Sequence, residues 1–72
     1  MEYVHVGSCI ERALDEKKIH YRKMAEDFGV LRQQVEKWRK AEDMSLRKID
    51  MFCSYFGYSR EGFLSLGHKY EG

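Results

Sequence analysis

The chain has 72 residues, enough for one small domain that buries only about 60% of the surface its unfolded form exposes. Hydrophobic residues make up 43% and charged residues 35%, a composition that supports a folded core under a water-soluble surface and argues against disorder. No apolar run approaches the roughly 20 residues that span a bilayer, and no secretion signal is recognisable, so a cytoplasmic protein without a membrane partner is expected. The net charge is +1, but residues 17–40 hold eight Lys or Arg against three Asp or Glu, which makes that segment +5 and the remainder −4. This distribution does not exclude a polyanionic partner.

The first predicted helix covers about residues 9–17. Ser8 and Glu11 have the spacing of a capping box at its start. An apolar face recurs at helical spacing in Ile10, Ala13 and Leu14. The preceding residues 3–6 have extended character but are too few to predict a strand.

Two further short helices follow, joined by a tight turn. The second begins near Tyr21 and ends at Gly29, because glycine accepts the left-handed backbone that closes a helix. The third packs one apolar face, and its other faces carry long polar side chains. The apolar positions are Tyr21, Met24, Ala25 and Phe28 in the second helix and Leu31, Val35 and Trp38 in the third.

The C-terminal part is predicted to form two helices and a tail. Ser45 caps the fourth helix, Gly57 ends it, and Ser59 caps a short fifth helix. Residues 67–72 have little to bury and are expected to form a flexible tail. The core of this single domain, residues 1–72, is predicted to contain Phe28, Val35, Trp38, Ile49, Phe52 and Phe56.

Catalytic residues, a metal site and a cofactor are not expected. Cys9 and Cys53 are far apart in the sequence and His5, His20 and His68 are scattered, so no metal-ligand spacing appears, and buried reduced thiols are the simpler interpretation. No acid pair, activated nucleophile or phosphate-binding glycine loop is present, and a helical domain this small offers little cleft for a small-molecule substrate. The chain is therefore predicted not to be an enzyme.

Residues 21–40 carry the most informative pattern. Two short helices joined by a tight glycine turn cross steeply, so their packing requires particular residue sizes at particular offsets. The chain has a small residue at the crossing, a glycine in the turn, an apolar plug beneath it and two apolar residues that hold the second helix to the first. These five residues are Ala25, Gly29, Val30, Val35 and Trp38.

In these residues the chain resembles the phage repressor and Cro family, also called the XRE-type helix-turn-helix family. The resemblance extends over residues 8–66. It also rests on Ile10, Leu14, Met24, Phe28, Ser45, Ile49, the run Phe56-Gly57-Tyr58-Ser59, and Phe63-Leu64. It implies a compact, all-α, five-helix, lambda-repressor-like DNA-binding domain without cofactors, with the helix-turn-helix in about residues 20–40.

The resemblance also implies how such a domain meets double-stranded DNA. The third helix lies in the major groove, where Arg32 offers a fork to guanine and Gln33 an amide to adenine, while the second helix crosses the phosphate backbone. The predicted base contacts are Arg32, Gln33, Gln34 and Lys37, and the predicted phosphate contacts are Tyr21, Arg22, Lys23, Arg39 and Lys40. The implied function is a sequence-specific transcriptional regulator, a Cro-like phage or prophage repressor on a palindromic operator.

Departures from the family pattern keep a second interpretation open. The family commonly has Ser or Thr where this chain has His20 and Leu31, which leaves the starts of the second and third helices open. After the third helix it usually has a glycine, basic residues and a proline, whereas this chain has the acidic step Glu42-Asp43, so the helix can run longer and carboxylates stand where phosphates are expected. The alternative is a helix-turn-helix domain that binds a protein, such as a repressor or polymerase subunit.

A homodimer is expected on energetic grounds. Three base contacts at about 1–3 kcal/mol each barely supply the roughly 4–10 kcal/mol that separates specific from nonspecific binding, whereas two subunits supply it readily. Apolar residues near the C-terminus exceed what so small a core needs. The predicted interface is Tyr58, Phe63, Leu66 and Tyr70, with Tyr3 and Val4 as additions.

Overall fold

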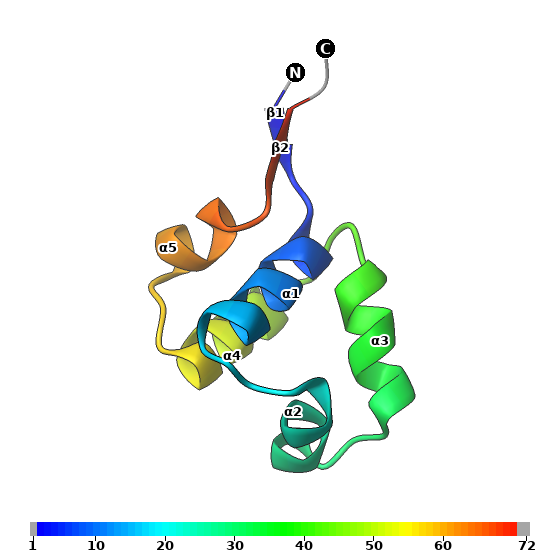
Figure 1. The fold of residues 1–72 in the computed structure, drawn as a ribbon. Helices are drawn as coiled ribbons and strands as arrows, with labels where there is room; N and C mark the ends of the chain where they lie inside the picture. Colours follow the sequence, from blue (N-terminus) through cyan, green and yellow to red (C-terminus); the bar gives the residue numbers. More distant parts are fainter. Residues whose placement is uncertain (1, 71–72) are drawn as a thin grey trace.

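In the part of the chain that the structure describes, five helices and two short strands make up the fold (Figure 1). The structure is a computed structural model that describes residues 2–70, with side chains described for residues 4–67. In chain order the elements are β1 (Glu2–Val4), α1 (Val6–Glu16), α2 (Tyr21–Phe28), α3 (Arg32–Lys40), α4 (Leu46–Phe56), α5 (Arg60–Ser65) and β2 (His68–Tyr70). The predicted all-α, five-helix domain is confirmed, with a strand pair added at its ends.

Helix α1 begins earlier than predicted, at Val6, and its cap is His5. The Nδ1 atom of His5 accepts a hydrogen bond from the backbone N–H of Ser8 at 3.0 Å, and the Ser8 hydroxyl lies 2.9 Å from the same nitrogen. Ser8 is therefore inside the helix, and Glu11 reaches Arg39 of α3 instead of the helix start. The capping-box prediction was wrong, because an imidazole takes the role that the pattern assigned to a hydroxyl.

The caps of α4 and α5 are confirmed. The Ser45 hydroxyl accepts from the N–H of Lys48 at 3.4 Å, and the Ser59 hydroxyl accepts from the N–H of Gly62 at 3.0 Å. Gly57 closes α4 with a φ of 81°, a left-handed value that glycine adopts without a Cβ clash. Serine side chains thus satisfy first-turn N–H groups of both helices.

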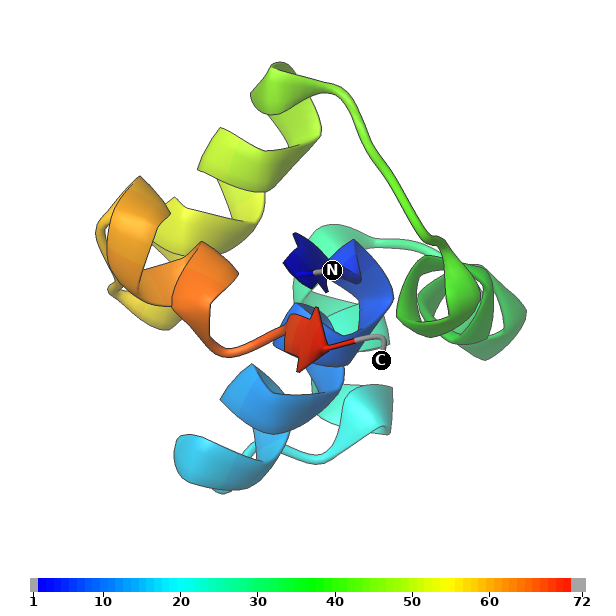
Figure 2. The same ribbon diagram turned by 90° about the horizontal axis from the view of Figure 1, so that it is seen from above.

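Helix α1 lies between α3 and the α4–α5 pair and contacts all three, which Figure 2 shows from above. One hydrophobic core fills the space between them. Cys9 and Cys53 are both buried and free, as predicted, and burial raises the pKa of each thiol. Every predicted core residue belongs to this core except Phe28, which is only half-buried.

Aromatic packing joins α2, α3 and α4. The Trp38 ring of α3 lies edge-on to Phe52 of α4, with 5.0 Å between the ring centroids, and edge-on to Phe28 of α2 at 5.6 Å. Phe28 is the last residue of α2 and lies at the margin of the core, which explains its partial exposure. Its ring also contacts that of Tyr55, with 4.8 Å between the ring centroids. Edge-to-face contacts of this kind add to the stabilisation from burial alone.

A polar contact braces α2 against α4 next to this aromatic group. The Asp27 carboxylate accepts a hydrogen bond from the Tyr55 hydroxyl at 2.6 Å and one from Lys23 at 2.8 Å. These two bonds, the lysine first, hold the pKa of Asp27 below its ordinary value of 3.8. Desolvation and the bond to Asp27 raise the pKa of Tyr55 to about 12.

The two ends of the described chain pair as an antiparallel ribbon at the top of the helical body (Figure 1). Glu2 faces Tyr70 and Val4 faces His68 in the register. Gly67 approaches α1 so closely that a Cβ there would collide with the Cys9 sulfur, and its carbonyl accepts from the N–H of His5 at 3.0 Å. The structure places residues 68–70 of the predicted tail in strand β2, while residues 71–72 lie outside the described residues.

Two residues predicted at a dimer interface are used inside the single chain. Phe63 is fully buried and stacks near Phe56, so it offers no surface to a second copy. Tyr58 is half-buried, with its hydroxyl enclosed and Lys17 4.7 Å over its ring. Leu66 and Val4 are half-buried against the core. The side chains of Tyr3 and Tyr70 lie outside those described.

The position of Trp38 predicts a large loss of stability on truncation. Trp38→Ala removes contacts to two helices and leaves a cavity, so the free energy of unfolding should fall by about 3–5 kcal/mol, measured by chemical denaturation. The control Leu46→Ala, at a residue that is 60% exposed, should change it by less than about 0.5 kcal/mol. Similar small effects in both variants would contradict the packing described for α3.

The brace predicts a pH dependence at both ends of the scale. The depressed pKa of Asp27 contributes stability above pH 3.8 that is lost as the pH falls below it, and the raised pKa of Tyr55 contributes stability below pH 10 that is lost as the pH rises toward about 12. Tyr55→Phe should lower stability at neutral pH and raise the pKa of Asp27 toward its ordinary value, measured by NMR titration.

Tyr58→Phe is the matched control, because the Tyr58 hydroxyl is buried without a hydrogen-bond partner among the described residues. Its removal should leave stability unchanged or raise it. An Asp27 pKa that stays depressed in Tyr55→Phe to the same extent as in Tyr58→Phe would show that the brace does not act as described.

Candidate nucleic-acid interface

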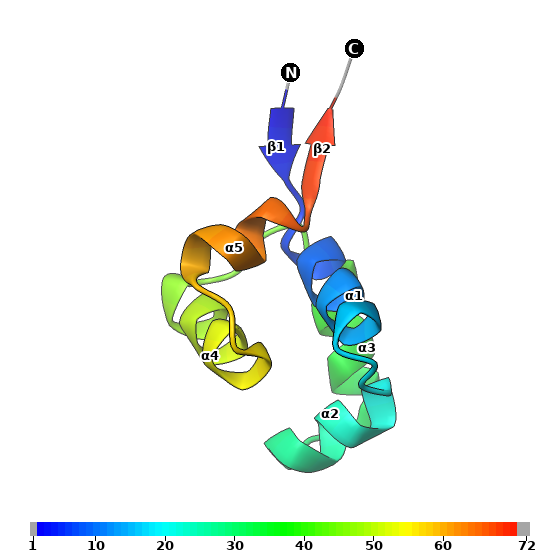
Figure 3. The same ribbon diagram turned by 60° about the vertical axis from the view of Figure 1, so that its left-hand side comes forward.

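Helices α2 and α3 form a helix-turn-helix, in which α2 lies at the end of the domain away from the strands and α3 runs from there along the side of the domain (Figures 1 and 3). Gly29 turns the chain with a φ of 68°, and the N–H of Val30 returns to the carbonyl of Ala25 at 2.9 Å. Ala25 and Val35 are buried where the two helices meet. The predicted roles of the small residue, the turn glycine and the apolar residues of α3 agree with this packing.

The starts of the two helices differ in how they are capped. The Nδ1 atom of His20 accepts from the N–H of Arg22 at 3.2 Å, so the imidazole replaces the usual hydroxyl at the start of α2. Leu31 precedes α3 and forms no side-chain cap, and the N–H of Gln34 bonds to the carbonyl of Leu31 at 2.9 Å. The question that the sequence left open is answered, because α2 starts at Tyr21 and α3 at Arg32.

The outward face of α3 contains three of the four predicted base contacts. Arg32, Gln33 and Lys37 are exposed, whereas Gln34 is half-buried on the flank of the helix. This division follows from helical geometry, since Val35 and Trp38 point into the core and the positions opposite to them point outward. The arrangement presents a guanidinium, an amide and an ammonium group side by side.

Two other residues on this surface were missed by the sequence reasoning. Glu36 is exposed and lies one helical turn from both Arg32 and Gln33, so a carboxylate stands among the predicted base contacts. Helical spacing could have identified it. Leu31 is 73% exposed immediately before α3. Its place in the apolar pattern had suggested packing, and only the structure shows that it projects into solvent.

The predicted phosphate contacts divide into free and paired cations. Arg22 and Lys40 are exposed and form no ion pair among the described residues. Lys23 pairs with Asp27 at 2.8 Å, and Arg39 pairs with Glu11 of α1 at 3.2 Å. The free cations are therefore the ones whose charge is most available to a polyanion.

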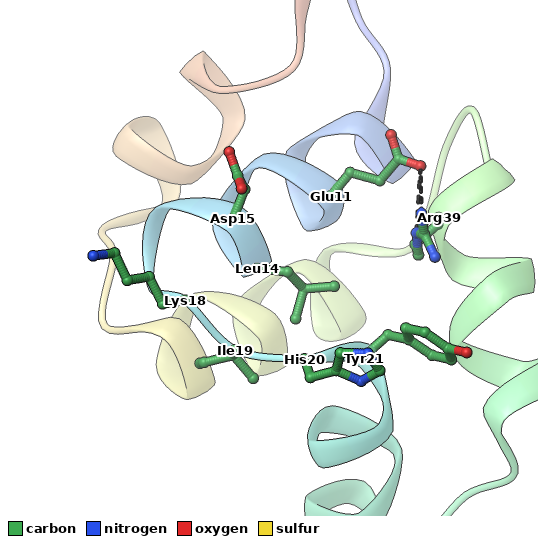
Figure 4. A pocket seen from close by; sticks show the side chains of 8 residues that line it. All are labelled: Glu11, Leu14, Asp15, Lys18, Ile19, His20, Tyr21 and Arg39. Atoms are coloured by element: carbon green, nitrogen blue, oxygen red, sulfur yellow. Dashed lines mark hydrogen bonds and ion pairs between the residues drawn. The ribbon is translucent and has the colours of Figure 1, made fainter.

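Figure 4 shows the surroundings of Arg39, where an open hollow lies between α1 and the start of α2. The Arg39 guanidinium lies 5.9 Å from the Tyr21 ring as well as against Glu11, and Tyr21 stacks on His20 with 4.6 Å between the ring centroids. Tyr21 is half-buried in consequence. Arg39 acts here as a link between α1, α2 and α3.

The acidic step lies at the other end of α3 from Arg32. Helix α3 ends at Lys40, so the longer helix that the sequence left open does not form. The following backbone is tied to the start of α1, where the N–H of Gly7 donates to the carbonyl of Ala41 at 2.8 Å and the N–H of Val6 to that of Glu42 at 3.3 Å. Nine residues of α3 separate Glu42 and Asp43 from the turn, about 13 Å along the helix. The two carboxylates therefore do not neutralise the N-terminal end of the outward face.

No group of three or more His, Cys, Asp or Glu side chains in the described part of the chain is placed to hold a metal ion. Within residues 2–70, none of the helices is both long and apolar enough to cross a membrane.

Comparison with known proteins agrees with this geometry. A family model described as Cro/C1-type HTH DNA-binding domain matches residues 10–64, which include all of α2, the turn, α3 and α4. The comparisons with curated proteins and with solved structures gave no match. The match spans most of the chain and contains the helix-turn-helix described above, and the chain therefore belongs to the Cro/C1-type helix-turn-helix family of DNA-binding domains.

Proposed function

We propose that this protein is a sequence-specific transcriptional regulator, a Cro-like phage or prophage repressor that binds a palindromic operator as a homodimer. The observation that carries the proposal is the outward face of α3, where Arg32, Gln33 and Lys37 are exposed at the open end of a helix-turn-helix. In this motif the N-terminal residues of the second helix meet base edges in the major groove. Arginine suits the O6 and N7 atoms of guanine, and glutamine suits the N6 and N7 atoms of adenine.

Charge supports the same orientation. Residues 17–40 have a net charge of +5, and Arg22 on α2 and Lys40 at the C-terminal end of α3 are exposed cations that the proposed docking brings to the phosphates. Phosphate contacts of this kind supply affinity without sequence information and make it dependent on salt. The Glu36 carboxylate adds selectivity because it repels phosphate groups. It also accepts hydrogen bonds only from donors, such as the N4 amine of cytosine.

The dimer is proposed from the energetic need for two sets of base contacts. The ribbon of β1 and β2 and the neighbouring Leu66 are its proposed contact region. A two-stranded ribbon leaves one edge of each strand without a strand partner among the described residues, and such edges pair readily with another chain. Phe63 takes no part, because it is buried in the monomer.

Selection of bound duplexes from a random DNA pool tests the proposal. The expected result is an inverted repeat whose half-sites lie about one helical turn apart, 10–10.5 base pairs between centres. A single half-site without symmetry would remove the dimer from the proposal. Failure to enrich any sequence, together with binding to a repressor or polymerase subunit, would favour the protein-binding alternative.

Substitutions separate base reading from phosphate binding on the selected site. Arg32→Ala and Gln33→Ala should each weaken binding by about 1–3 kcal/mol and relax the preference at one base position. Lys40→Ala should weaken all sequences alike and lower the salt slope by about one unit for each lost phosphate contact. Both effects are measured by titration of duplexes at several salt concentrations.

Arg12→Ala is the control for these variants, since Arg12 is exposed on α1, outside the helix-turn-helix. It should leave site preference unchanged. Site preference that survives in Arg32→Ala and Gln33→Ala as fully as in Arg12→Ala would contradict the assignment of α3 as the reading helix.

A further inference from the structure

Leu31 occupies a position that local physical rules disfavour. It is 73% exposed, the largest exposed fraction among the large hydrophobic residues that the structure describes, and it stands at the N-cap of α3 without a side-chain hydrogen bond. Serine, threonine, asparagine or aspartate at an N-cap would accept from a first-turn N–H, which leucine cannot do. The residue therefore gives up a cap and also leaves apolar surface in water.

The fold does not require this side chain. Val30, one residue earlier, is half-buried against the core, and Val35 is fully buried under α3, so these two residues hold the turn in place. Leu31, in contrast, is largely exposed to solvent. A residue that breaks a local rule without a compensating contact in the monomer points to a contact made with something else.

The neighbours of Leu31 are the predicted base contacts. Leu31 lines one surface hollow together with Tyr21, Arg32, Gln33 and Glu36, and a second together with residues that include Gln33, Gln34 and Lys37. Leu31 is thus an exposed apolar residue next to polar side chains. A ligand bound in the hollow that Arg32 and Gln33 line therefore lies close to the leucine.

We propose that Leu31 contacts the 5-methyl group of a thymine and is a specificity-determining residue of this protein. The inference rests on the proposed DNA-binding function. Among the base edges in the major groove, the thymine methyl is the apolar group, and aliphatic side chains recognise it by contact. Leu31 lies at the end of α3 that enters the groove, where this contact removes exposed apolar surface of the leucine from water.

The test uses the duplex selected by the protein, with each thymine replaced in turn by deoxyuridine, which lacks only the methyl group. For the unchanged protein, each half-site should contain one thymine whose replacement alone weakens binding about fourfold. This is the effect of one methyl group that is no longer buried. The Leu31→Ser variant should bind the thymine duplex more weakly and respond to no such replacement. Since serine also caps the helix, this variant should be at least as stable as the unchanged protein in chemical denaturation, so misfolding does not explain the loss.

Leu46→Ser is the matched control, because Leu46 is the other strongly exposed leucine and begins α4, outside the helix-turn-helix. It should keep the full response to deoxyuridine. An equal response in Leu31→Ser, or no response in the unchanged protein, overturns the inference while leaving the proposed function intact. A protein that selects no sequence at all overturns both, and loss of a protein partner in Leu31→Ser would show that the exposed leucine serves protein binding.

Discussion

The packing of Trp38 determines where the outward face of α3 points. One ring on α3 meets Phe28 of α2 and Phe52 of α4, so the orientation of the helix is set against two neighbours at once. With Val35 buried on the same side, the opposite side is left to Arg32 and the polar residues that follow it. In a domain this small no second core can hold the helix, so its function depends on this one cluster.

Charge is divided between holding the domain together and meeting a partner. Arg39 and Lys23 belong to the first group. Arg39 is paired with Glu11 and lies over the Tyr21 ring, and Lys23 is paired with the Asp27 carboxylate that also binds Tyr55. Arg22 and Lys40 are exposed without an ion pair among the described residues, so their charge is free for the proposed phosphate contacts. A count of basic residues in the sequence cannot make this distinction, because the carboxylate that engages Arg39 comes from α1, 28 positions away in the chain.

The sequence predicted the helix-turn-helix because its signals are local: Gly29 permits a left-handed turn, and Val35 and Trp38 recur at helical spacing. It did not predict the β1–β2 ribbon, whose pairing joins the two ends of the chain and leaves no short-range pattern. The His5 cap was missed because imidazole caps depend on ring orientation. The exposure of Leu31 was also hidden, since an apolar residue in an apolar pattern indicates burial.

The most direct test of α3 as the DNA-reading helix is a map of the contact surface by NMR, in which the backbone amides of isotope-labelled protein are followed as duplex DNA is added. If α3 reads the major groove, the largest shift changes should fall on residues 31–37, with smaller ones at Arg22 where α2 crosses the phosphates. The exposed side of α4 around Leu46 and Met51 should change little. Changes concentrated on that side of α4, with residues 31–37 unaffected, would contradict the DNA-reading role of α3.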